Sequence, residues 1–124
     1  AGDLTRASLT EAHLDGVNLK GGKPFPDSRR HRLVLRSAKL DGASLRKAGL
    51  IGAILEFASL RKADMSGAIL AGSALAGADL RGAQVSGADF NAADLDGTHL
   101  EELAGRDSAI NWDKARHLQQ AYVK

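Results

Sequence analysis

The chain of 124 residues contains no cysteine and only two prolines, and aromatic residues make up 4% of it. Without cysteine, disulfides and thiol chemistry are excluded, while the redox compartment stays open. So few aromatic residues would give an ordinary globular domain a thin core. No apolar run approaches the roughly 20 residues that span a bilayer, and no signal peptide is evident. We expect one domain or a short solenoid cut from a longer protein, and a cytoplasmic location is favoured.

A large apolar residue returns at every fifth position from Leu35 to Leu100. Two positions earlier, from Ala38 to Ala93, stands an alanine in every repeat except at Ser73. A helix turns about 100° per residue, and a straight strand alternates faces with period two, so neither buries a period of five on one side. A backbone that turns a corner once per pentad does so, and four corners close a square coil.

In such a coil every twentieth residue stacks on the one below at about 4.8 Å, with parallel hydrogen bonding between coils. The predicted interior columns are Leu35, Leu55, Leu75, Leu95; Leu40, Leu60, Leu80, Leu100; Leu45, Met65, Val85; and Leu50, Leu70, Phe90. The alanines fill the narrow space beside them. Glycines near the corners suit turns that strain other residues, and Asp64, Asp79, Asp89 and Asp94 are placed to accept hydrogen bonds from turn amides.

Several units match the motif A(D/N)LXX, most closely Ala78-Asp79-Leu80 and Ala93-Asp94-Leu95. Ala63-Asp64-Met65 and Ala88-Asp89-Phe90 depart from it only at the central residue. With these units at fixed phase over nearly the whole chain, the sequence resembles the pentapeptide repeat family. The resemblance implies an all-β solenoid, a right-handed quadrilateral parallel β-helix, in a bacterial protein. It indicates a fold rather than an activity, because members of this family do unrelated things.

The predicted solenoid covers residues 1–110 and is interrupted by a loop at 21–32. The distance from Leu19 to Leu35 is sixteen residues, which is no multiple of five, and the segment between them contains Gly21, Gly22 and both prolines. No capping element precedes the first repeat. An upstream domain, pairing with another chain and a frayed end therefore remain alternatives.

Beyond Leu100 the period fails, and residues 111–124 are predicted to form a short C-terminal capping α-helix. Asn111 would be its N-cap, and Trp112, Leu118 and Tyr122 would share one face at helical spacing. This helix should lie over the last coil and close it. The resemblance also makes it a candidate homodimer interface.

Apolar residues occupy outward positions near the corner where the predicted loop would leave the coil. Ile51, Ile54 and Phe57 form this group, and Phe25, between two prolines, is expected to fold over it. A covered local core and an open partner-binding patch are both compatible with the pattern. The candidate partner-binding residues are Phe25, Arg29, Arg30, Arg32, Ile51, Ile54 and Phe57.

No enzyme signature, cofactor motif or metal site is found, because the four histidines are scattered and a filled coil has no convergent pocket. Charge is uneven: residues 20–39 are strongly basic, and residues 79–102 are mainly acidic. We therefore expect a noncatalytic interaction or scaffold module that binds a protein partner. The alternative, suggested by the resemblance, is a DNA-mimicking protein that binds gyrase and confers quinolone resistance, although the net charge of +2 disfavours it. Direct binding of nucleic acid through Arg29, Arg30 and Arg32 is a weaker third hypothesis.

Overall fold

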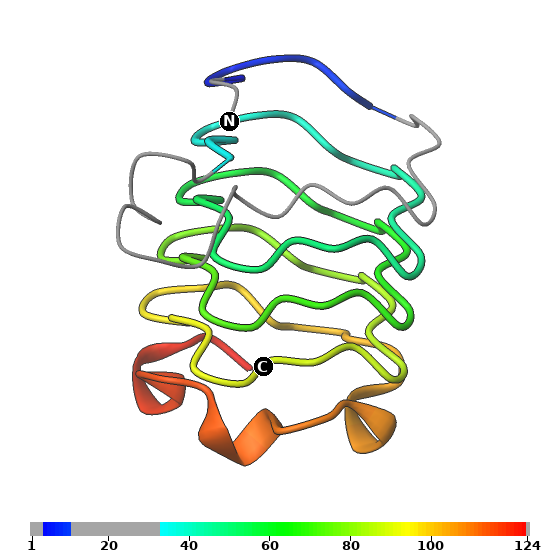
Figure 1. Cartoon of the computed structure of the whole chain (residues 1–124), viewed down its shortest axis with the longest axis vertical. Helices are drawn as coiled ribbons and strands as arrows, with labels where there is room; N and C mark the ends of the chain where they lie inside the picture. Colours follow the sequence, from blue (N-terminus) through cyan, green and yellow to red (C-terminus); the bar gives the residue numbers. More distant parts are fainter. Residues whose placement is uncertain (1–3, 11–32, 124) are drawn as a thin grey trace.

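The computed structural model describes residues 4–10 and 33–123, which form a stack of coils (Figure 1). Successive coils pair through parallel bridges between residues twenty positions apart, as in Val34 with Ile54 and Ile54 with Ala74. Four such columns of bridges run along the stack, so each coil has four walls. The columns contain Val34, Ile54, Ala74, Asp94; Lys39, Ser59, Asp79, His99; Ser44, Asp64, Gln84, Ala104; and Gly49, Ile69, Asp89, Ile110. Within the described residues each bridge is isolated rather than part of a longer named strand.

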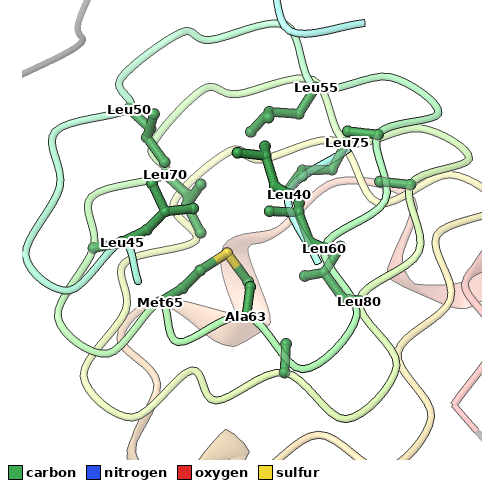
Figure 2. Packing of buried hydrophobic residues seen from close by; sticks show 14 of the residues in the cluster. Leu40, Leu45, Leu50, Leu55, Leu60, Ala63, Met65, Leu70, Leu75 and Leu80 are labelled. Carbon is green, nitrogen blue, oxygen red and sulfur yellow. The ribbon is translucent and has the colours of Figure 1, made fainter. Parts of the chain in front are cut away.

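The interior is filled by the predicted columns of large residues (Figure 2). From Leu35 to Leu100, each central residue of a pentad is at most 3% exposed. The alanines at the other inward position are 0–1% exposed, and Ser73 and Thr98 are buried in the same role. The predicted periodicity of five and its assignment of interior residues are confirmed. This packing leaves the walls and corners as the functional surface.

Each corner is a tight turn closed by one backbone hydrogen bond, such as Ala38 N–H to Leu35 O at 3.0 Å. The third turn residue has a positive φ, as type II turns require. Glycine supplies it at eight corners from Gly42 to Gly97, whereas Phe57, Lys62 and Ala92 adopt it with a side chain. The role predicted for corner glycines is therefore confirmed.

The aspartates that precede central residues hold the next turn, as expected from the sequence. In each case Oδ1 accepts the backbone N–H two residues later, at 3.0–3.1 Å. These aspartates are Asp64, Asp79, Asp89 and Asp94. Their side chains thus have a structural role in the turns.

The first described residues continue the ladder with a different offset. Ser8 bridges Lys39, which is 31 positions later instead of twenty. This offset is eleven residues longer than the offset of the regular body. The predicted loop at 21–32 lies outside the described residues.

The predicted C-terminal α-helix is wrong. Three 3₁₀ turns are found instead: η2 at Arg106–Ser108, η3 at Trp112–Lys114 and η4 at Leu118–Gln120, at the end of the stack in Figure 1. Between them the ladder continues beyond residue 110, since Ile110, Arg116 and Tyr122 bridge Asp89, Asp94 and His99. The last coil thus has a period of six, and we call residues 104–123 the terminal coil.

A repeated sequence of backbone conformations gives this segment its period of six. A left-handed residue precedes each 3₁₀ turn, and an extended alanine follows it. The left-handed residues are Gly105, Asn111 and His117, and the alanines are Ala109, Ala115 and Ala121. Ladder bonds to the previous coil, such as Ile110 N–H to Ala88 O at 2.7 Å, replace the bonds that a helix would make. An isolated helix this short would be marginal in water.

Candidate protein-interaction surface

Apolar side chains lie on two adjoining walls, at the corner between these walls and at the next corner of the same coil. Ile51, Phe57 and Ile69 are 44%, 65% and 40% exposed, and Ile54 is half-buried. Ile69 belongs to the bridge column of one wall and Ile54 to that of the next, while Ile51 begins the corner turn between them. We call these four residues the apolar strip.

Phe57 is held in place by its corner geometry. Its backbone is left-handed, with φ of 59°, and its ring lies against Gly77 in the next coil. A Cβ placed on Gly77 would lie 2.5 Å from Cε1 of Phe57, so the ring occupies space that only glycine leaves free. Lys47 lies over Gly67 in the same manner. A side chain at a left-handed corner therefore lies over the same corner of the following coil when that corner has a glycine.

The structure brings together some of the predicted partner-binding residues. Ile51, Ile54 and Phe57 follow one another along one coil, at two successive corners and on the wall between them, and Ile69 lies on the adjoining wall of the next coil. The remaining candidates, Phe25, Arg29, Arg30 and Arg32, lie outside the described residues.

The residues predicted to form a cap or dimer interface do not share a helix face. Trp112 is half-buried and meets Phe90 edge to face, with ring centroids 5.0 Å apart. Leu118 is also half-buried and packs against the core. Tyr122 is 54% exposed and stacks on His99 at 4.6 Å, outside the coil.

Two aspartates on the walls are paired with charged or polar neighbours. Asp79 forms a two-point contact with Arg81, at 2.9 and 2.7 Å, and the hydrogen bonds from Arg81 lower the pKa of Asp79. Partial burial opposes ionisation of Asp94, but hydrogen bonds from His117, at 2.8 Å, and from Asp96 N–H lower the pKa of Asp94 overall. These carboxylates contribute to stability and are not arranged for acid-base catalysis.

The described part of the chain offers no metal centre, since no three histidine, aspartate or glutamate side chains in it converge. Nor does any helix in residues 4–10 and 33–123 have the length and apolar character to cross a membrane. An exposed apolar surface on a filled coil can bind another molecule, whereas catalysis needs convergent polar groups.

A model of pentapeptide repeats matches residues 32–67 and 68–102, with eight copies. A search of curated proteins finds no significant match. Among solved structures, the chain is similar to HetL, a pentapeptide repeat protein involved in heterocyst differentiation regulation in the cyanobacterium Nostoc sp. strain PCC 7120. The two share 28% identity over 96% of this chain and 50% of HetL, with a TM-score of 0.84. The chain thus spans half the length of HetL.

Two other pentapeptide repeat proteins show the same architecture. A second protein from Nostoc is 27% identical over 98% of this chain and 84% of its own, with a TM-score of 0.52. One from the thylakoid lumen of Arabidopsis thaliana is 24% identical over 85% of this chain and 69% of its own, with a TM-score of 0.59. Since the family model covers more than half of its residues, the chain belongs to the pentapeptide repeat family.

Proposed function

We propose that this protein is a noncatalytic interaction module that binds a protein partner through the apolar strip. The observation that carries the proposal is the exposure of Ile51, Phe57 and Ile69 on successive corners and an adjoining wall of two neighbouring coils, outside the buried core. HetL, which resembles this chain over half of its own length, is named as a regulatory protein, and this supports a binding role.

The apolar strip has the features of a binding anchor. Phe57 is 65% exposed, and its ring lies against Gly77 in the next coil, so an aromatic side chain is presented at the surface of the corner. Aromatic residues in such positions often carry a large share of binding free energy. We further propose that Phe25, Arg29, Arg30 and Arg32 contribute to partner binding beside the apolar strip. We also propose that the coil is right-handed and that the protein is located in the cytoplasm.

A matched pair of variants tests this proposal. Phe57→Asn removes the ring from a left-handed corner that asparagine tolerates, and Lys47→Asn makes the same change at another left-handed corner over a glycine. Immobilised wild type and both variants would be cross-linked in extracts of the source organism. A specific protein captured by wild type and Lys47→Asn, but lost with Phe57→Asn, supports the proposal. The same set of proteins on all three would refute it.

Gyrase binding by imitation of DNA is the second candidate. Acidic residues in the later coils, Asp96 and Glu102 among them, give it some support. However, Asp79 is paired with arginine and Asp94 with His117, so a continuous free acidic face is not formed by these residues. A gyrase supercoiling assay with and without quinolone distinguishes the two functions, because only the DNA mimic should change supercoiling or protect it from the drug.

A further inference from the structure

One corner of the solenoid carries opposite charges in a symmetric order. Three of its stacked pairs are Arg61–Lys62, then Arg81–Gly82, then Glu101–Glu102. The pair Asp41–Gly42 stacks before them, and Asp41 Oδ1 accepts the Arg61 N–H at 3.0 Å. Backbone bonds establish the stacking, from Lys62 N–H to Arg81 O and from Gly82 N–H to Glu101 O, both at 3.0 Å. We call the six residues of the first three pairs the charged stripe.

Three of the four end residues of the charged stripe have an exposed charge, whereas Glu101 is partly buried beside His99. The side chains of Arg61 and Arg81 are 54% and 46% exposed, and Lys62 and Glu102 are exposed as well. Arg81 is bound to Asp79, and Arg61 lies 3.9 Å from the same carboxylate. Neither Lys62 nor Glu102 forms an ion pair with any residue that the structure describes.

At the centre of the charged stripe, the side chain of Arg81 is 46% exposed. Gly82 has no side chain, and the stem of Lys62 lies along it, with Cγ 3.4 Å from where a Cβ would be. Coils are spaced at about 4.8 Å, so each end pair lies about 5 Å from this centre, and the basic and acidic pairs are about 10 Å apart.

We propose that two copies of this chain associate side by side and antiparallel along the charged stripe. A two-fold axis through the Arg81–Gly82 level places Arg61 and Lys62 of each copy opposite Glu101 and Glu102 of the other. This is an isologous contact, in which one surface complements itself. A partner of uniform charge would instead meet repulsion at one half of the stripe.

The expected dimer is weak and sensitive to salt. Exposed ion pairs contribute little individually, and a small polar contact is typical of transient association. The Debye length falls from about 10 Å at 0.1 M to about 3 Å at 1 M ionic strength, so salt should dissociate the dimer. We expect a dissociation constant in the high micromolar to millimolar range, about 0.1–1 mM, at low ionic strength.

Charge reversal gives a direct test by sedimentation velocity at about 0.5 mM protein. The basic-reversed variant carries Arg61→Glu and Lys62→Glu, and the acid-reversed variant carries Glu101→Lys and Glu102→Lys. Each alone should be monomeric, whereas an equimolar mixture should form a heterodimer, because every stripe then meets its opposite. Arg46→Glu with Lys47→Glu, on the next corner, is the control that should keep the wild-type dimer.

Several outcomes would overturn the proposal. These are a wild type that is monomeric at about 20 mM salt, where screening is weakest, a dimer that survives about 1 M salt, and a dimer that survives basic reversal. Glu101 is partly buried, so a version with Glu102→Lys alone replaces the acid-reversed variant if circular dichroism shows misfolding. Failure of this proposal leaves the apolar strip untouched, because the two surfaces have no residue in common.

Discussion

Two stacked corner residues allow the strain of the left-handed turn to be measured in both directions. Gly72 has φ of 65°, and Ala92, in the next coil of the same corner, has φ of 58°. A Cβ at Gly72 would have no described atom within 4 Å, so Gly72→Ala tests the backbone alone. An L-residue in this conformation costs about 1–2 kcal/mol. The lower entropy of the unfolded alanine chain offsets about 0.4–1 kcal/mol of that.

We therefore expect Gly72→Ala to lower the free energy of unfolding by about 1 kcal/mol and Ala92→Gly to raise it by a similar amount. For a chain of this size, each change should shift the melting temperature by about 3–5 °C in opposite directions. Urea denaturation followed by circular dichroism measures both, and the m-value should stay constant. Gly72→Asn is the control and should cost less than alanine, because asparagine tolerates this region. If Gly72→Ala matches wild type and Ala92→Gly gains nothing, the account of the corners is refuted.

Other predictions concern the core, two buried hydroxyls, one close contact and one carboxylate. Gly77→Ala should destabilise more than Gly72→Ala because its Cβ would meet Phe57, and Phe57→Gly should remove the difference in thermal melts. Ser73→Ala should stabilise the protein by about 1 kcal/mol, because the Ser73 hydroxyl is buried with no partner in the described part. Thr98→Val should destabilise it by about 1 kcal/mol, because Thr98 Oγ1 donates a hydrogen bond to Leu75 O. Leu60→Ala should cost about 2–5 kcal/mol by opening a cavity, and Ala63→Leu about 1–3 kcal/mol by overpacking, in urea denaturation. The pKa of Asp94 is lowered below 3.8 in the folded protein, so its contribution to stability is present above pH 3.8. This contribution is lost as the pH falls through the pKa of the folded state. Asp94→Asn should therefore lose less stability than wild type over this acidic range.

The regular body was predictable because a single repeat spacing along the sequence determines which residues face the interior. A period of five with alternating large and small residues permits only a coil that turns at each pentad, so the spacing alone places Leu40, Met65 and Phe90 inside, where all three are buried. The hydrogen bonds of Asp64 and Asp79 followed from the same phase. Handedness was expected from the family resemblance and not from the spacing.

The terminal coil was not predicted because its pattern also fits a helix. Trp112, Leu118 and Tyr122 have spacings that place them on one helical face, and this helical spacing conceals the period of six. Two signals could have revealed it: alanine at 109, 115 and 121, and Gly105, Asn111 and His117 at the same interval. Glycine and asparagine tolerate the left-handed conformation, and histidine is enriched there too.

The apolar strip was predicted in part. The five-residue phase placed Ile51 and Ile54 at outward positions beside one corner, with Phe57 nearby; Ile51 and Phe57 are exposed, in two successive corner turns. The contact between the Phe57 ring and Gly77 was not predicted. Glycine recurs at most corners, so the sequence does not show which glycine contacts a side chain of the previous coil. Only the packing in three dimensions distinguishes a glycine needed for its φ from one needed for space.

The central claim is that Phe57 anchors a protein partner, and the most direct measurement is affinity. The partner captured by wild type would be titrated calorimetrically against wild type, Phe57→Asn and Lys47→Asn. The account predicts that Phe57→Asn weakens binding by at least about tenfold, as loss of a buried aromatic anchor should, while Lys47→Asn changes it by less than about twofold. Equal affinities for all three proteins would contradict the claim.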